Sequence, residues 1–235
     1  MSSVKSLALF ERPAPVDPAI FPRACEPLEE VGAGEPADAA AAFGFSLSRL
    51  AEPDDPRPLV LVTTADWLRE RGRPFARGLR AWGATAERLI WVRTAREAEA
   101  LWALEEALKS GAVSGGLATV ETPPFVATRR LDFAARAGAA AGVILRAGTG
   151  GDLSAARRRW RIRCGPSAAN GFDVDAPGRV RLSAELVRRR DGPPGAWLLE
   201  QDDETGRLGV VAGLAGHGLD EAAAGRDGRV ASQAA

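Results

Sequence analysis

Short, unbroken apolar segments alternate with helical segments along the middle of this chain, and this alternation restricts the possible folds more than any other feature. The apolar segments include Leu59–Val62, Leu89–Val92 and Gly142–Leu145. Continuous apolar strands are typical of parallel sheets that are covered on both faces. Between them, Glu97–Lys109 carries leucines at helical spacing, and Gly111 follows it as a helix stop. The sequence therefore predicts an α/β fold with a mostly parallel sheet, flanking helices and right-handed crossovers.

The pattern changes after about residue 150. Apolar residues alternate with arginines in Arg159–Cys164 and again in Val180–Leu186, and two further short apolar segments follow, Trp197–Glu200 and Leu208–Ala212. Strict alternation is typical of antiparallel strands with one covered face. We therefore expect antiparallel strands that extend the sheet on its C-terminal side.

Composition divides the chain into three parts. Residues 1–27 are rich in proline, which blocks helix continuation, and predict an extended N-terminal arm. Residues 28–212 carry the strand and helix pattern and predict one core domain, for which the length is ample. Residues 213–235 are Gly, Ala, Asp and Arg without aromatic anchors, and predict a disordered tail.

Composition also excludes several classes of protein. Basic and acidic residues number 31 each, and no apolar run approaches the ~18 residues of a membrane span. The first residues lack the apolar segment of a signal peptide. Two cysteines, Cys25 and Cys164, and one histidine are too few for a disulfide scaffold or a multi-histidine metal site. We expect a cytoplasmic protein with inert thiols, no metal, no cofactor and no membrane partner.

The zero net charge is unevenly distributed. Residues 1–58 contain five basic and ten acidic groups, whereas residues 150–200 contain ten arginines and six acidic groups. Such asymmetry favours electrostatic docking to another protein or to DNA, without choosing between them.

Several stretches carry a resemblance to a known family. The most specific is LWALEEALKSGAV, which spans Leu101–Val113. The others are Arg88–Thr94, Ala127–Leu131, Ala141–Arg146, Arg158–Ile162 and Pro194–Glu200. Together they resemble the ImuA family, the RecA-like component of the bacterial inducible-mutagenesis cassette. The resemblance covers roughly Leu28 to Asp202 and implies a RecA-like core.

A working RecA-type ATPase needs a phosphate-binding loop, G-x-x-x-x-G-K-[ST], after its first core strand. The matching place begins at Gly32 and includes Gly34. There the second glycine becomes Ala37, the lysine becomes Asp38 and the hydroxyl residue becomes Ala39. Reversing one charge beside a polyanion costs several kcal/mol, for a pair ~4 Å apart at an effective dielectric constant near 20. We expect a plain strand-to-helix turn that binds no ATP.

Two more parts of an ATPase site are missing. Thr119 lies near the place of the magnesium-linked aspartate, and Thr63, Thr64 and Ala65 stand where a water-activating glutamate should follow its strand. Asp66 is the nearest carboxylate. The sequence therefore predicts a protein without catalytic residues, whose fold is kept for binding.

The densest cationic stretch contains Arg157, Arg158, Arg159, Trp160 and Arg161. Arginines can bind phosphates and a tryptophan can stack on a base, so these residues are candidates for contact with single-stranded DNA or a partner. The alternative is a strand with Trp160 buried and the arginines solvated. Five other tryptophans fit amphipathic or strand positions, where core packing is expected: Trp67, Trp82, Trp91, Trp102 and Trp197.

The resemblance implies a non-enzymatic accessory role in damage-induced (SOS) translesion DNA synthesis. The implied partners are the ImuB-like Y-family relative and an error-prone C-family DNA polymerase, with RecA as a further candidate. The location is cytoplasmic, with nucleoid association open. Three alternatives stay open: a single-stranded-DNA-binding protein, a SulA-like inhibitor of cell division, and a residual ATPase with a rearranged loop.

Overall fold

The computed structural model describes residues 21–51, 54–147, 152–173, 175–190 and 192–213. Its strands form one mixed sheet in the order β3-β2-β4-β5-β1-β6-β7-β8-β9. The strands are β1 (Leu28–Ala33), β2 (Leu59–Thr64), β3 (Leu89–Thr94), β4 (Gly115–Thr119), β5 (Ala141–Arg146), β6 (Arg158–Cys164), β7 (Arg181–Arg189), β8 (Gly195–Gln201) and β9 (Leu208–Gly213).

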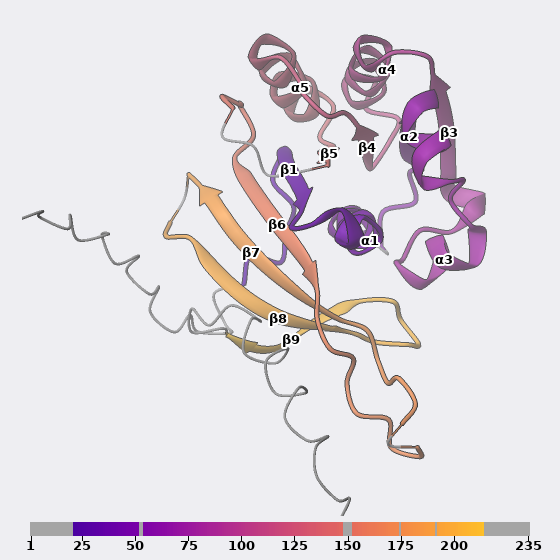
Figure 1. Ribbon diagram of the computed structural model, residues 1–235. Helices are drawn as coiled ribbons and strands as arrows, with labels where there is room; N and C mark the ends of the chain where they lie inside the picture. The colour runs from indigo at the N-terminus through magenta and orange to yellow at the C-terminus, as the bar shows by residue number, and fades with distance from the viewer. Residues whose placement is uncertain (1–20, 52–53, 148–151, 174, 191, 214–235) are drawn as a thin grey trace, which may run out of the picture.

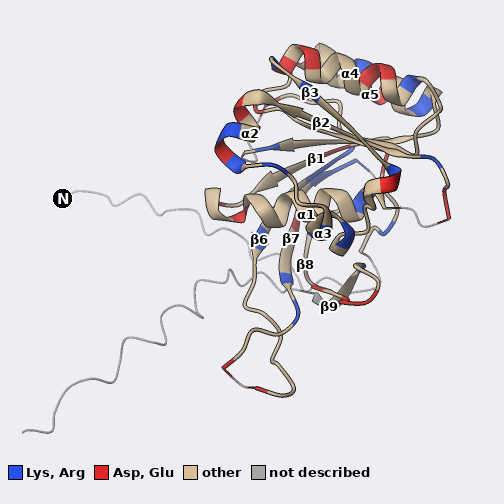
Figure 2. Cartoon of the chain, turned by 90° about the vertical axis from the view of Figure 1, so that its right-hand side faces the viewer, with Lys and Arg blue, Asp and Glu red and all other residues tan. Residues whose placement is uncertain are grey.

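The first six strands are parallel, and helices cover both faces of this half of the sheet. Figures 1 and 2 show α4 (Glu97–Lys109) and α5 (Phe125–Ala137) on one face and α1 (Ala39–Leu50) on the other. The short helices α2 (Ala65–Arg71) and α3 (Ala76–Ala81) follow β2. Two buried apolar clusters lie on the two faces, one beneath α1 and one beneath α4 and α5.

Strands β6 to β9 are antiparallel and extend the sheet on its C-terminal side. Their inward side chains alternate with outward ones, and Trp160 and Trp197 are fully buried. Trp160 packs against Phe45 of α1, with ring centroids 5.2 Å apart. The predicted class is confirmed: a mostly parallel, helix-flanked α/β core with an antiparallel extension.

The sequence pattern predicts helices that begin at about Ala37 and at Thr128, and both boundaries differ in the structure. A 3₁₀ turn, η2 (Pro36–Asp38), precedes α1, because Pro36 is suited to a first helical position and Asp38 and Glu35 cap each other. Helix α5 begins at Phe125 rather than Thr128. Its first turn follows Pro124 directly, which the apolar pattern alone does not reveal.

The expectation of core packing was wrong for Trp102 and Trp91. Trp197 is buried and Trp67 and Trp82 are half-buried, but the Trp102 side chain is 61% exposed and Trp91 is 36% exposed. In α4 the buried stripe is formed by alanine and leucine residues, which leaves Trp102 on the opposite face. The helical spacing of apolar residues places an aromatic residue near the boundary of the buried stripe. It does not determine whether that residue faces the core or the solvent.

Part of the predicted arm is attached to the core. Phe21 packs against Trp160 and Trp197, with ring centroids 5.8 and 5.4 Å apart. The rest of the predicted arm, residues 1–20, and nearly all of the predicted tail, residues 214–235, lie outside the described residues. Among the helices that are described, none has the length and apolar character needed to cross a membrane.

Candidate functional site

The turn between β1 and α1 is closed by a carboxylate of the chain itself. The Asp38 carboxylate accepts hydrogen bonds from the backbone N–H of Glu35 (2.9 Å) and of Cys164 (2.8 Å). Asp38 is 8% exposed, and the N–H of Gly34 donates to the carbonyl of Ile162 at 2.7 Å. Backbone donors that could face a bound phosphate are therefore directed to the protein's own acceptors.

This arrangement changes what the start of α1 can attract. A helix N-terminus ordinarily favours an anion, because its first N–H groups are unpaired and its dipole is positive there. Here Asp38 supplies that negative charge from within the turn. Ala37 and Ala39 add no side-chain donor, and Gly32 is buried within β1. The geometry fits the predicted plain strand-to-helix turn.

The remaining ATPase positions hold buried threonines with structural hydrogen bonds. The Thr63 hydroxyl accepts from Nε1 of Trp91 at 2.8 Å, the Thr64 hydroxyl accepts from the N–H of Trp67 at 3.2 Å, and the Thr119 hydroxyl accepts from the N–H of Thr64 at 3.3 Å. Thr64 thereby caps α2. Asp66 is exposed and pairs with Arg69 at 2.6 Å, and it lines a shallow cavity together with Thr64 and Thr119.

The basic stretch lies on β6, directly beside β1. The parallel register places Arg158 opposite Glu29 and Arg159 opposite Glu30. Arg158 contacts Glu29 at 3.2 Å and Arg159 contacts Glu30 at 2.7 Å. Both arginines are about 95% buried. These two side chains neutralise interior carboxylates and do not form an exposed cationic surface.

Trp160 is buried as well, and its Nε1 donates to Glu29 at 2.8 Å. Arg157 and Arg161 are partly exposed. Arg157 lies 3.7 Å from Asp132, and Arg161 pairs with Glu185 at 3.0 Å. The structure therefore does not bring the five candidate residues to one surface, and contact with DNA or a partner through Arg157 and Arg161 stays a prediction.

The centre of the network is Glu29, which sequence reasoning missed. Arg49 of α1 donates to its two carboxylate oxygens, from Nε at 3.1 Å and from Nη2 at 2.8 Å. Burial would raise the pKa of Glu29, but the attraction of Arg49 and hydrogen bonds from Arg49, the Glu26 backbone and Trp160 outweigh it and lower that pKa below its ordinary value. The sequence did contain a signal for this network, because Glu29 and its neighbour Glu30 lie inside an otherwise apolar strand.

Arg49 also joins the N-terminal segment to the core. Its Nη1 donates to the carbonyls of Pro22 (2.6 Å) and Arg23 (2.8 Å), and its Nη2 donates to that of Ala24 (2.7 Å). Burial would lower the pKa of Arg49, but Glu29 and the other nearby anionic groups raise it. A permanent cation therefore holds together β1, α1 and the chain before β1.

The thiols do not have the properties of nucleophiles. Burial, together with the charge of Glu29, raises the pKa of Cys25 well above its ordinary value. Burial and the charge of Asp38 also raise the pKa of Cys164. Both therefore favour the protonated, unreactive form near neutral pH. Among the described residues no three His, Cys, Asp or Glu side chains are grouped so as to hold a metal ion.

Comparison with known proteins identifies relatives. No protein-family model matches the chain. Protein ImuA of Caulobacter vibrioides, from strain NA1000 / CB15N and from strain ATCC 19089 / CIP 103742 / CB 15, is 39% identical over 174 residues, which are 68% of this chain and 70% of that protein. The crystal structure of SulA from Pseudomonas aeruginosa covers 52% of this chain and 98% of its own, at 26% identity and a TM-score of 0.40. The identity and coverage shared with Protein ImuA show that the chain belongs to the ImuA family.

Proposed function

We propose that this chain is a non-enzymatic accessory protein of damage-induced translesion DNA synthesis. It acts through contacts with an ImuB-like Y-family relative and an error-prone C-family DNA polymerase, and RecA is a further candidate partner. Membership in the ImuA family supports the setting. The observation that supports the non-enzymatic part of this proposal is the β1–α1 turn, where the buried Asp38 carboxylate accepts two backbone hydrogen bonds.

Exposed apolar side chains support a role in protein contacts. Helices α4 and α5 expose Trp102 and Phe133, each 61% accessible, and Val126, 68% accessible. Helices α4 and α5 lie side by side on one face of the sheet (Figure 1). Large apolar groups left in water are typical of interaction surfaces. We name Trp102, Val126 and Phe133 the α4–α5 face.

Partner binding by this face can be tested with two purified partners, the ImuB-like protein and the C-family polymerase. We expect the full chain to form a complex with at least one of them in size-exclusion chromatography with light scattering. Replacing Trp102→Ser and Phe133→Ser together should weaken that complex at least about tenfold, since buried aromatic anchors dominate such interfaces.

Phe172→Ser is the matched control, because Phe172 is likewise an exposed aromatic residue but lies in the connection between β6 and β7. It should leave the complex intact. No complex with either partner would contradict the proposed function. A complex that the α4–α5 double variant retains at full strength would place the interface elsewhere on the chain and contradict the role of this face.

A further inference from the structure

A pocket lies at the end of the sheet opposite the β1–α1 turn. Ser48, Arg49 and Ala51 at the end of α1 line it, together with Leu59 at the start of β2 and Ser114 just before β4. These strands run parallel to β1, so this pocket lies at their amino ends, whereas the turn lies at the carboxyl end of β1. The cavity volume is about 320 Å³, within the ~300–1,000 Å³ of small-molecule sites.

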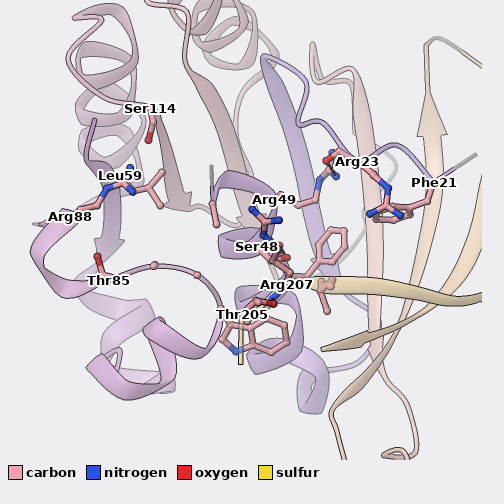
Figure 3. A pocket seen from close by; sticks show the side chains of 17 residues that line it. Phe21, Arg23, Ser48, Arg49, Leu59, Thr85, Arg88, Ser114, Thr205 and Arg207 are labelled. Atoms are coloured by element: carbon pink, nitrogen blue, oxygen red, sulfur yellow. Dashed lines mark hydrogen bonds between the residues drawn. The ribbon is translucent and has the colours of Figure 1, made fainter. Parts of the chain in front are cut away.

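The lining of this pocket is cationic. Its 17 residues include four arginines and no aspartate or glutamate. Arg49 is neutralised by Glu29, which leaves Arg23, Arg88 and Arg207. Figure 3 shows Arg88 on one side of the pocket, Arg207 near its middle and Arg23 on the other side. Four hydroxyl groups also line the pocket, of Ser48, Thr85, Ser114 and Thr205. Three of them, all but that of Thr85, already donate to acceptors of the chain, so toward a ligand they can act as acceptors.

The nearest carboxylates have other partners. Asp55, which lies near Arg88, is bound bidentately by Arg57, at 3.1 Å from Nε and 2.7 Å from Nη2. Asp202, beside the Thr205–Arg207 turn, accepts from the Thr205 hydroxyl at 2.7 Å. Arg88 donates from Nη2 to the carbonyls of Asp55 and Arg57, and its Nε is buried without an acceptor. Nη2 of Arg88 is thus engaged by the chain itself and its Nε lies below the surface, so Arg88 contributes positive charge to the pocket wall.

The balance of charge favours a dianion. The carboxyl end of α1 faces the pocket and contributes about half a negative charge, which the three arginines outweigh. A carboxylate would supply only one negative charge, whereas a phosphate monoester supplies about 1.5 to 2 at neutral pH and three acceptor oxygens. Guanidinium groups match these oxygens geometrically.

The pocket also has an apolar wall suited to a planar group. Phe21, Phe45 and Trp82 line it, and Trp82 lies against Gly44, where an added Cβ would be 2.2 Å from the indole ring. This contact fixes the position of the indole beside the cavity. Aromatic rings stack on nucleobases whatever the base.

We propose that this pocket binds a phosphate monoester that carries a planar base, with the size of a nucleoside monophosphate. Arg23 and Arg207 receive the phosphate, Arg88 adds positive charge to the pocket, and Trp82 and Phe21 contact the base. With no carboxylate in the lining to hold a divalent cation, binding needs no magnesium. The proposal goes beyond the proposed accessory function and does not depend on it.

Isothermal titration of the full chain with AMP, adenosine and ribose 5-phosphate tests this site. AMP should bind at concentrations below about 1 mM, with or without magnesium, and more tightly than either fragment. The double variant Arg23→Ala/Arg207→Ala should lose at least about tenfold in affinity, since charge-assisted hydrogen bonds are removed. Both arginines are exposed, so the fold should persist, as circular dichroism can verify.

Arg77→Ala is the matched control, because Arg77 is an exposed arginine of α3 outside this pocket. It should bind AMP like the unaltered chain. Absence of AMP binding, equal affinity for adenosine and AMP, or unchanged affinity in the double variant would each overturn the proposal. None of these results would affect complex formation with the polymerase partners, so failure of this site and failure of the accessory role are distinguishable.

Discussion

At the scale of single residues, the structure depends most on Glu29. A carboxylate that is fully buried in a sheet is unfavourable unless cations and hydrogen-bond donors surround it. Arg49, Arg158 and Trp160 together supply both. Removing the negative charge of Glu29 would leave the buried guanidinium groups of Arg49 and Arg158 without this anionic partner.

The substitution Glu29→Gln should therefore destabilise the protein by about 3–5 kcal/mol, which is the usual cost of removing one partner of a buried ion pair. Urea unfolding followed by tryptophan fluorescence measures this change. Glu99→Gln is the control, because Glu99 pairs with Arg96 on the exposed start of α4 and surface pairs contribute little. Equal stability of the two variants would show that the Glu29 network is not structural.

Acid stability should reflect the same residue. The pKa of Glu29 is lowered in the folded state, against the upward effect of burial, by Arg49 and its hydrogen bonds, so below the ordinary value of 4.5 the unfolded chain binds a proton that the folded chain does not. The stabilisation is therefore present above about pH 4.5 and is lost as the pH falls through the folded-state pKa. Urea unfolding between pH 6 and pH 3 should show a steeper loss for the unaltered chain than for Glu29→Gln. Parallel curves for the two proteins would contradict this assignment.

At the scale of elements, the alternation of apolar segments predicted the strands and the order of helices. Apolar periodicity reports which residues avoid water, and both faces of β2 and β5 are covered. It could not predict the ion pairs between β1 and β6, since these strands are adjacent in the sheet but more than a hundred residues apart in the chain. The sequence predicts that these arginines are solvated or bind DNA. They are buried instead, because their carboxylate partners lie on that distant strand.

The junction of α4 and α5 shows how closely the helices approach. Gly138, the C-cap of α5, lies where an added Cβ would be 1.8 Å from the carbonyl oxygen of Leu108 in α4. Two backbone segments cannot rearrange as a flexible side chain does. Glycine is therefore required here by the space between the helices.

Gly138→Ala should lower the free energy of unfolding by about 1–3 kcal/mol, as overpacking of a close contact does. Gly78→Ala is the matched control within α3, where no atom lies within 4 Å of the added Cβ. It should be neutral or stabilising by up to about 1 kcal/mol, because alanine favours helices. Thermal unfolding of both variants provides the measurement. A Gly138→Ala protein as stable as Gly78→Ala would mean that α4 and α5 do not approach so closely.

At the scale of the whole molecule, the zero net charge is in part an internal balance. The acidic N-terminal quarter and the basic sheet extension were expected to dock to a partner, but Glu29 and Glu30 pair with Arg158 and Arg159 in the interior. The partly exposed Glu26 and Arg157 also form a pair. Within the described part of the chain, we assign binding to two surface features: the α4–α5 face, and the arginine pocket, which is the cavity lined by Arg23, Arg88 and Arg207. The missing phosphate loop could be predicted from the sequence, because it is local. The closure of that turn by Cys164 could not, because it comes from β6.

The central claim is that the β1–α1 turn no longer binds nucleotide and that the fold serves binding to proteins. Titration of the full chain with a fluorescent ATP analogue, with and without magnesium, tests it most directly. We predict no magnesium-dependent binding up to about 1 mM, the upper end of ordinary substrate affinities. Binding independent of magnesium and lost in Arg23→Ala/Arg207→Ala belongs to the arginine pocket and agrees with the account. Tight, magnesium-dependent binding that this double variant retains would contradict it.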